Sequence, residues 1–464
     1  MGTRIKRIRF ALIGILLLCA MAMQARAATI TVTNTNDSGP GSLRQALGDA
    51  NDGDAISFAV IGTIRLTTGG LLIARNVTIS YPGINQFSVD GNQALFVFGV
   101  LPGKTVAISG LTVTNGQFGV WNEQGTLSVS SCMVSGNSAV GLYNHEGTLT
   151  VNNSVASLNS AGGLGNDFGV LSVTSCIVSG NGSYGLGNNG FELPPPDIHS
   201  SSGAFLTIDN SIISGNSGSG VWNTGSVTIL NSTLTGNSVQ GDFGGGIRSG
   251  SFKAVGSVVT VINSTISGNS AQDGGGISND YGLLSIVNST ISGNSAGGGG
   301  GGIGNYAGTV QIANSTINGN SAGSGGGIYN EADQYGGIVE TGNTIFDAGI
   351  SGENIFNNGG TVTSHGYNLS SDDGGGYLNG PGDQINTDPL LGPLQDNGGP
   401  TLTHAPLPGS PAIDAGDPNF TPPPFRDQRG ACFHRVFRRI DVGSVETQPE
   451  RPCPAPRPRP TPPR

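Results

Sequence analysis

The stretch NSTISGNSAQDGGGISN, at residues 263–279, indicates the architecture of the whole chain because it recurs. Close copies follow at 288–305 and 314–330, and related units begin near residue 115. Outside two longer insertions the unit is 21 to 26 residues long. A period of this length is the signature of a solenoid, in which each repeat packs on its neighbours.

The composition agrees with a solenoid. The 464 residues include 80 glycines and 25 prolines, and so high a share would otherwise suggest low complexity or collagen. The glycines occur at fixed points of the unit, which excludes both.

Each unit contains three short apolar segments. In one repeat they are Leu284 with Ile286, then Ile291, then Ile303. Two-residue spacing and β-branched side chains predict strands, and the Asn and Gly between them tolerate the left-handed backbone of turns. The sequence therefore predicts an all-β fold, a right-handed parallel β-helix solenoid with three strands per coil and coils roughly 4.8 Å apart.

The repeat also predicts the direction of its side chains. We expect Ile266 and Ile277 to point inward, and Asn269 and Asn279 to lie at corners where ladders of amides satisfy bent backbone. Charge is scarce because like charges at one repeat position would lie in a column. The first ladder is aligned on Asn115, Asn137, Asn159, Asn181, Asn216, Asn237, Asn269, Asn294 and Asn320.

The chain divides into five predicted regions. Residues 1–27 form a signal peptide, with a basic start, an apolar run too short to span a bilayer and a small-residue cleavage site. Residues 28–60 form an N-terminal cap, 61–365 the β-helix, 366–446 a C-terminal capping domain, and 447–464 a Pro-rich tail with the composition of an extended linker.

Within the N-terminal cap, GSLRQALGDAN at 41–51 predicts a short amphipathic helix over the first coil. Ser42 and Gln45 form a capping box there, and apolar residues follow at helical spacing.

The C-terminal region carries specific motifs. They are NTDPLLGPLQDNGGPTLTHAPLPGSPAIDAG at 386–416, DQRG at 427–430 and DVGSVE at 441–446, and NTNDSGPGSLRQAL stands at 34–47 near the start. In these motifs the chain resembles choice-of-anchor Q proteins, secreted bacterial β-helix proteins of the pectin-lyase-like fold that share a terminal domain followed by various surface anchors. The resemblance covers roughly 30–60 and 365–446. It implies a secreted, extracellular or cell-envelope location and no defined reaction, and the tail shows no sorting motif.

Charge limits the partners. Removal of the signal takes away five of the 20 basic residues and none of the 30 acids, which leaves 15 against 30, a formal charge of −15. This balance argues against nucleic acid or anionic lipid as a partner. No second long apolar run follows, so we expect no transmembrane segment in the mature chain.

One group of side chains predicts a ligand-binding patch. Glu123, His145 and Asp167 follow the Asn residues of a second ladder at intervals of 22 residues, which places them on three adjacent coils. Trp121 and Tyr143 precede that ladder and should point outward. Aromatic faces beside a carboxylate and an imidazole can bind a sugar, hold a metal or move a proton. The alternative is a solvated corner that alternates residue types to avoid like charges. Trp222, at the equivalent position further along, would lengthen the aromatic platform.

The sequence matches the catalytic motifs of β-helix enzymes poorly. The strings NTD, DD and HG of β-helix hydrolases occur at 386–388, 372–373 and 365–366, in reversed order and inside the C-terminal signature. A lyase would need a basic residue on the coils, and between residues 110 and 340 the candidates are Arg248 and Lys253.

The cysteines argue against redox or zinc chemistry. Cys132 and Cys176 take the place of an inward Ser and should act as small buried hydrophobes. They are two coils apart, about 9.6 Å, which exceeds the roughly 7 Å that a disulfide bridges. A disulfide between Cys432 and Cys453 is possible in an oxidising compartment. We predict no cofactor and no metal.

Two functions remain open. One is a non-catalytic surface or secreted protein with an adhesive, binding or structural role at the bacterial envelope, whose partner is a polysaccharide or cell-surface glycan. The other is a polysaccharide lyase or glycoside hydrolase of the pectin-lyase-like fold.

Overall fold

The computed structural model describes residues 27–83, 86–190, 203–250, 256–334 and 336–448. Almost all of the predicted signal peptide 1–27 and of the tail 447–464 lies outside these residues, as do Lys253 and Cys453. Among the described residues, no helix is both long and apolar enough to span a bilayer.

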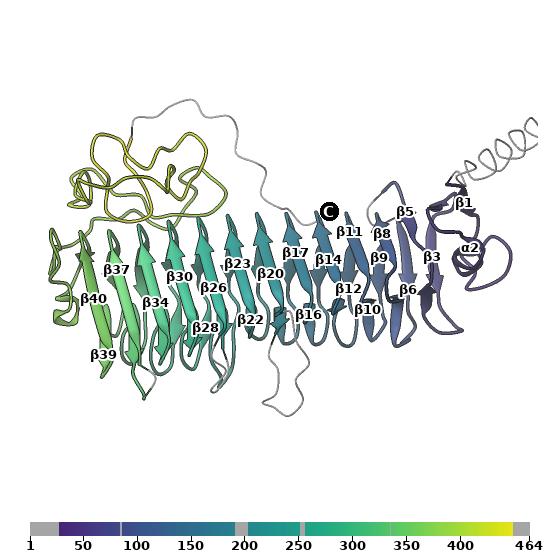
Figure 1. The fold of residues 1–464 in the computed structure, drawn as a ribbon, viewed down its shortest axis with the longest axis horizontal. Coiled ribbons are helices and arrows are strands. Elements are labelled where there is room, and N and C mark those ends of the chain that lie inside the picture. The colour runs from purple at the N-terminus through teal and green to yellow at the C-terminus, as the bar shows by residue number, and fades with distance from the viewer. Residues whose placement is uncertain (1–26, 84–85, 191–202, 251–255, 335, 449–464) are drawn as a thin grey trace, which may run out of the picture.

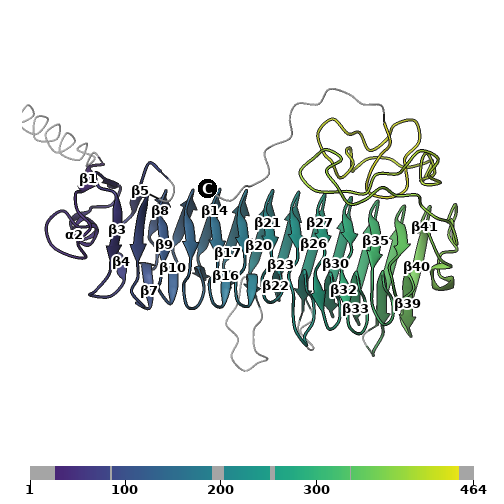
Figure 2. The same cartoon turned by 180° about the vertical axis from the view of Figure 1, so that it is seen from behind.

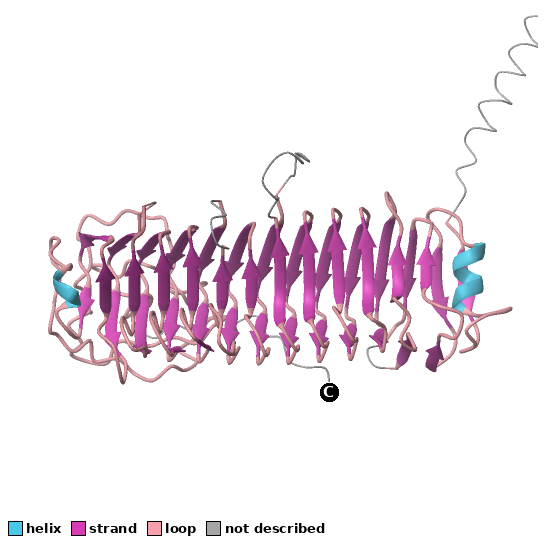
Figure 3. Cartoon of the chain, turned by 90° about the horizontal axis from the view of Figure 1, so that it is seen from below, coloured by secondary structure: helices cyan, strands magenta, loops and turns pink. Residues whose placement is uncertain are grey.

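The chain is an all-β, right-handed parallel β-solenoid of about 13 turns, as predicted (Figure 1). Its long sheets have 14, 12 and 13 strands, and each complete coil contributes one strand to each sheet, while the coils at the two ends are incomplete. The short helical segments α2 (Leu43–Asp49) and η1 (Gly374–Gly376) lie at opposite ends of the rod (Figure 3).

The strands of each sheet run in chain order from coil to coil. The 14-stranded sheet consists of β1 (Thr29–Val32), β2 (Ala55–Phe58), β5 (Val77–Ser80), β8 (Thr105–Ser109), β11 (Thr126–Ser130), β14 (Thr148–Asn152), β17 (Val170–Thr174), β20 (Phe205–Asp209), β23 (Ser226–Leu230), β26 (Val258–Ile262), β30 (Leu283–Val287), β34 (Thr309–Ala313), β37 (Ile338–Gly342) and β40 (Thr361–Gly366). The 12-stranded sheet consists of β4 (Leu71–Ile73), β7 (Phe96–Val100), β10 (Phe118–Glu123), β13 (Leu142–His145), β16 (Gly162–Asp167), β19 (Tyr184–Asn189), β22 (Val221–Asn223), β25 (Ile247–Ser249), β29 (Ile277–Asp280), β33 (Ile303–Tyr306), β36 (Ile328–Glu331) and β39 (Ile355–Asn358). The 13-stranded sheet consists of β3 (Gly62–Arg65), β6 (Phe87–Asp90), β9 (Thr112–Thr114), β12 (Met133–Ser135), β15 (Val155–Ser157), β18 (Ile177–Ser179), β21 (Ile212–Ser214), β24 (Thr233–Thr235), β27 (Thr265–Ser267), β31 (Thr290–Ser292), β35 (Thr316–Asn320), β38 (Ile345–Ala348) and β41 (Leu369–Ser370). A small fourth sheet pairs β28 (Ser270–Ala271) with β32 (Ser295–Ala296).

Stacked aliphatic side chains fill the rod. Ile266 and Ile277 are fully buried, as predicted, and pair with Ile291 and Ile303 on the next coil. Because every coil places a similar side chain at the same position, the core is one continuous cluster along the solenoid.

Two ladders of buried asparagines turn the corners. In the first, the Asn269 amide donates to Asn294 Oδ1 at 2.9 Å and to the backbone oxygen of Leu234 at 3.1 Å. The predicted alignment is wrong at its first member. Gly116 donates its backbone N–H to Asn137 Oδ1, whereas Asn115 lies one residue earlier, in a left-handed turn with φ 57°.

The second ladder follows the strands of the 12-stranded sheet. Its buried members are Asn122, Asn144, Asn166, Asn188, Asn223, Asn279, Asn305 and Asn330. Ser249 interrupts it on the coil of β25, where its hydroxyl donates to Ser257 Oγ instead.

The thiols lie where the repeat predicts. Cys132 and Cys176 are buried and free, and their backbone N–H groups donate to Ser154 Oγ and Ser211 Oγ. Burial raises the pKa of each thiol to about 11. Cys432 is also free.

The predicted N-terminal helix forms as α2. Ser42 accepts a hydrogen bond from the backbone N–H of Gln45 at 3.1 Å, and Leu43 joins the core. The Gln45 side chain donates to Asp49 Oδ1, so the second half of the capping box does not form.

Residues 386–446 fold as irregular turns along the side of the last coils (Figures 1 and 2). Gln428 is fully buried there, and its amide donates to Thr265 Oγ1 at 3.0 Å while Thr290 Oγ1 donates to its oxygen at 2.6 Å. The shorter segment 369–384 follows the last coil directly. In it, Asp372 accepts hydrogen bonds from the backbone of Asn354 and Gly374.

Candidate ligand-binding face

The outer side of the 12-stranded sheet carries a long series of partly exposed aromatic side chains, which we call the aromatic face. Strands β10, β16 and β22 of this sheet lie on the side of the rod opposite to residues 386–446 (Figures 1 and 2). The aromatic residues are Phe96, Phe118, Trp121, Tyr143, Tyr184, Trp222, Tyr306, Tyr329 and Phe356.

The structure brings the five predicted site residues together on this face. Trp121 pairs with Tyr143 across β10 and β13, and Glu123 pairs with His145. His145 in turn pairs with Asp167 on β16. All five are partly exposed and come from three adjacent coils, as the interval of 22 residues predicts.

Glu123 holds two of these residues. One of its carboxylate oxygens accepts from Trp121 Nε1, and the other lies beside His145 Nδ1, both at 2.9 Å. Burial favours the protonated form, but the hydrogen bonds from Trp121 and His145 outweigh it and lower the pKa of Glu123. Glu123 is therefore a carboxylate at neutral pH.

Tyr143 is held from the other side. Its hydroxyl donates to Asp167 Oδ2 on the neighbouring strand β16. Burial and the Asp167 carboxylate raise the pKa of Tyr143 well above its ordinary value, so the phenol keeps its proton.

Phe118 completes this aromatic cluster, and sequence reasoning missed it. Its ring centre lies 4.7 Å from that of Trp121, and Trp121 lies 4.9 Å from Tyr143, with both pairs edge to face. Phe118 lies three residues before Trp121 in the sequence. A search for a second aromatic residue three positions before Trp121 would have found it.

Glycines make room for the rings. A Cβ on Gly165 would approach Tyr143 Cδ2 to 2.9 Å, and one on Gly162 would overlap the Tyr184 ring. The rings therefore lie close against the backbone of the sheet. Tyr184 continues the series to Trp222, 6.3 Å away.

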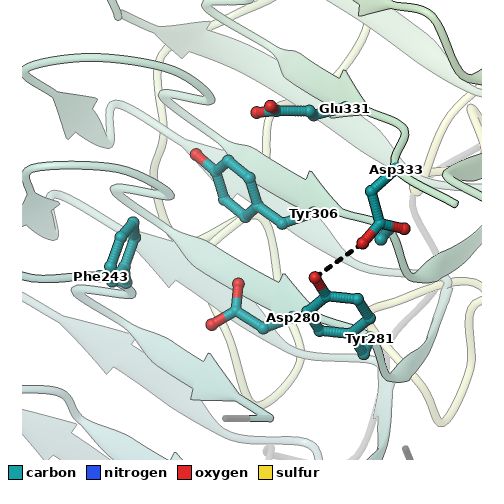
Figure 4. A pocket seen from close by; sticks show the side chains of 7 residues that line it. Phe243, Asp280, Tyr281, Tyr306, Glu331 and Asp333 are labelled. Carbon is teal, nitrogen blue, oxygen red and sulfur yellow. Dashed lines mark hydrogen bonds between the residues drawn. The ribbon is translucent and has the colours of Figure 1, made fainter. Parts of the chain in front are cut away.

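Further along the face, the side chains enclose a cavity of about 190 Å³ (Figure 4). It is lined by residues of β29, β33 and β36, by the residues that follow these strands and by the loop before β25. They are Phe243, Asp280, Tyr281, Tyr306, Ala307, Glu331 and Asp333. We call this cavity the Tyr306 pocket.

Sequence reasoning missed this pocket, although the repeat carries a signal for it. Asp280, Tyr306 and Glu331 each follow an asparagine of the second ladder, as Glu123 follows Asn122. In the structure Asp280 pairs with Tyr306, and Tyr306 with Glu331, so the three form one column over three coils.

Asp280 has an unusual environment. Its pKa is raised to about 6, chiefly by burial and also by the charges of Asp242 and Asp273, while the Ser278 hydroxyl and Arg248 act in the opposite direction. The carboxyl group therefore exchanges its proton close to neutral pH, a property that is enriched at functional sites.

Tyr306 forms the centre of the pocket. Its hydroxyl oxygen is buried, and no hydrogen-bond partner for it exists in the described part of the chain. Its ring lies 5.9 Å from Phe243 and 5.8 Å from Tyr329. Burial together with Asp273 and Asp280 raises the pKa of the phenol.

Arg248, one of the basic residues considered for a lyase, lies beside this pocket on β25. Its Nη1 binds Asp242 Oδ2 at 2.5 Å, and its guanidinium lies 5.8 Å from the centre of the Phe243 ring. This pair holds the guanidinium against Asp242. Lys253 lies outside the described residues.

The three hydrolase-like motifs, at 365–366, 372–373 and 386–388, do not come together on the aromatic face. His365 projects from β40 of the 14-stranded sheet, and Asp372 binds backbone beyond the last coil. Over the described residues, no group of three or more His, Cys, Asp or Glu side chains is placed to hold a metal ion.

Comparisons with known proteins find similarity among solved structures. No protein-family model matches the sequence, and no curated protein is significantly similar to it. Among solved structures, pectate lyase Pel9A matches with a TM-score of 0.43 at 15% identity, over 91% of this chain and 97% of its own. The A-module of the mannuronan C-5 epimerase AlgE4 of Azotobacter vinelandii matches with a TM-score of 0.42 at 18% identity, over 79% and 90%. The catalytic domain of a GH87 α-1,3-glucanase in complex with nigerose matches with a TM-score of 0.43 at 12% identity, over 70% and 68%.

Proposed function

We propose that the protein binds an extended polysaccharide along its aromatic face. The observation that carries this proposal is the row of partly exposed aromatic rings along the 12-stranded sheet, interrupted at β16, β25 and β29, with carboxylates and an imidazole beside it. Aromatic rings offer apolar faces to sugar rings, and carboxylates accept hydrogen bonds from sugar hydroxyls. A polymer along the rod would meet a new set of outward side chains roughly every 4.8 Å.

The predicted signal peptide and the resemblance to choice-of-anchor Q proteins support a location outside the cell or in the cell envelope. There the rigid rod would act as an adhesive or structural protein. Its net charge makes a surface glycan a better partner than nucleic acid or anionic lipid.

Replacement of Trp121 and Tyr143 by Ala tests this function. We expect the double variant to lose at least about tenfold in affinity for the polysaccharide that the wild-type protein binds best in a panel of acidic, neutral and amino polysaccharides, since stacking on one ring is worth roughly 1 kcal/mol. The melting temperature should fall by only a few degrees, because both side chains are partly exposed.

The matched control is Phe205→Ala. Phe205 is 49% exposed on the 14-stranded sheet, away from the aromatic face, so its loss should leave binding unchanged. Equal binding by wild type and the double variant, with similar melts, would contradict the proposal.

A second candidate function, hydrolysis of a glycosidic bond, is favoured by Asp280. A carboxyl with a pKa of about 6 can donate a proton near neutral pH, and Glu331 stands two coils away in the same column. Two coils place the backbones of Asp280 and Glu331 about 9.6 Å apart, close to the roughly 6.5–9.5 Å that separate the paired carboxyls of inverting glycosidases.

Release of reducing ends from the same polysaccharide panel tests this second function. Asp280→Asn should reduce the rate by about 10² or more if Asp280 is the acid, because general acid catalysis contributes a factor of this size. Binding of a polysaccharide without any release of reducing ends would contradict hydrolysis and support the binding function.

A further inference from the structure

Counted over the residues that the structure describes, the Tyr306 pocket has an excess of negative charge. Asp280, Glu331 and Asp333 line it, and Asp242 and Asp273 are close enough to act on the Asp280 carboxyl. Among the described groups that act on that carboxyl, one is a cation, Arg248, and Asp242 already binds it.

The excess of negative charge favours the protonated forms of Asp280 and Tyr306. The charged form of Asp280 is disfavoured because it is buried near other carboxylates, and Tyr306 is held in its neutral form for the same reasons. A buried charge is stabilised by an opposite charge that also forms hydrogen bonds. The described pocket residues supply no such free cation for Asp280, so a ligand that brings one would bind favourably.

The walls also suit a cation. Phe243 and Tyr306 form an edge-to-face pair with ring centres 5.9 Å apart, and aromatic rings attract positive charge over their faces. The carboxylates of Asp280 and Glu331, which line the cavity, can accept hydrogen bonds. An ammonium group has three N–H donors to give.

We infer that the Tyr306 pocket binds the protonated amino group of a sugar unit, so that the polysaccharide on the aromatic face is one that contains amino sugars. This inference rests on the proposed binding function and names its ligand class. The cavity of about 190 Å³ is smaller than the roughly 300–1,000 Å³ of sites for larger ligands, which fits a single sugar unit.

The same charges disfavour acidic polysaccharides. A uronate unit in the pocket would place its carboxylate beside Asp280 and Glu331, and like charges repel at this distance. A neutral sugar would leave the excess charge of the pocket uncompensated. We therefore expect affinity to rank amino, then neutral, then acidic sugars.

Three oligosaccharides of equal length test the inference on the full chain: one of glucosamine, one of N-acetylglucosamine and one of galacturonate. Calorimetric titrations are made just above the pKa of Asp280, about 6, where its carboxylate is charged and a sugar amine still carries a proton. We expect the glucosamine oligomer to bind at least about tenfold more tightly than the acetylated one, as one desolvated cation–π and ion-pair contact allows. The preference should shrink as the pH falls below 6 and Asp280 takes up a proton.

Asp280→Asn keeps the shape of the side chain and removes its charge. It should abolish the preference for the glucosamine oligomer, and Glu331→Gln should reduce it. Glu340→Gln removes a charge from the 14-stranded sheet, so it should leave the preference intact.

The outcomes separate this inference from the proposed function. Tighter binding of the acetylated or the acidic oligomer, or a preference that survives in Asp280→Asn, would overturn the inference alone. Binding of other polysaccharides through Trp121 and Tyr143, without binding of the glucosamine oligomer, would do the same. A protein that binds no polysaccharide would contradict the proposed function as well.

Discussion

At the scale of single residues, Asp280 lines the Tyr306 pocket and also lowers the free energy of unfolding at neutral pH. Its folded pKa, about 6, lies above its ordinary value of 3.8. An acid with a raised folded pKa stabilises the fold fully below its unfolded pKa, and this contribution is lost as the pH rises through the folded pKa. Asp280 therefore destabilises the native protein at neutral pH.

Asp280→Asn should make the protein more stable at pH 7 by up to about 3 kcal/mol, since one pKa unit corresponds to about 1.4 kcal/mol. At a pH of about 3 the difference should disappear, because the carboxyl is then protonated in both the native and the unfolded protein. Thermal melts of wild type and variant at both values check this. A variant less stable at neutral pH would show that the Asp280 carboxylate has a favourable partner.

The glycines beneath the rings are the other critical single residues. Gly162→Ala should displace the Tyr184 ring, because the added Cβ overlaps it, and so weaken polysaccharide binding several-fold. Gly203→Ala is the control, since a Cβ there meets nothing within 4 Å. Binding assays of the two variants side by side make the comparison, and equal affinities would mean that Tyr184 takes no part in binding.

At the scale of the repeated elements, the asparagine ladders hold each coil on the next. Asn166 accepts from Asn144 at 2.7 Å and donates to Asn188 at 2.8 Å and to the oxygen of Gly169 at 2.9 Å. All three asparagine side chains are buried, so each polar group left without its partner costs roughly 1–3 kcal/mol. The ladder therefore contributes to the stability of the coil and to its regular register.

We expect Asn166→Ala to destabilise the protein by about 3 kcal/mol or more, because it leaves several buried groups unpaired. Asn189→Ala, at the partly exposed end of β19, should cost less than about 1 kcal/mol. Urea unfolding of both variants gives the difference. Equal costs would mean that the ladder amides find water or other partners.

At the scale of the whole molecule, residues 386–446 are joined to the rod by buried polar contacts. His404 is buried at this junction: its Nδ1 donates to the oxygen of Gly392 at 2.7 Å, and its Nε2 accepts from Ser292 Oγ at 2.8 Å. Burial lowers the pKa of His404. A histidine with a lowered folded pKa stabilises the fold above its unfolded pKa, and this contribution is lost as the pH falls below that value, 6.5.

Acid should therefore loosen this region before it melts the solenoid. Hydrogen exchange of residues 386–446 should increase as the pH falls from about 7 to about 5, after correction for the intrinsic rate, while that of β14 stays slow. His404→Gln, which can keep both hydrogen bonds without titrating, should reduce the change. Identical profiles for the two proteins would assign the acid sensitivity to other groups.

The repeat pattern of the sequence was enough to predict the solenoid, its three strands per coil, the inward aliphatic columns and the proximity of the residues around Glu123. A regular period explains this success, because each position of a stacked repeat meets its equivalents on both sides, so a local pattern implies a tertiary contact. The one-residue error at Asn115 fell where the repeat begins and the pattern is weakest.

The Tyr306 pocket and the place of residues 386–446 depend instead on how the chain folds in three dimensions. Phe243 reaches the pocket from the loop before β25, where the paired residue of the next coil is Asp273, so the period does not predict an aromatic ring there. The raised pKa of Asp280 depends on burial and on carboxylates from other coils, which only the folded chain brings together. The C-terminal residues have no repeat, and they dock through buried groups such as Gln428, whose partners on the rod lie 138 and 163 residues away in the sequence.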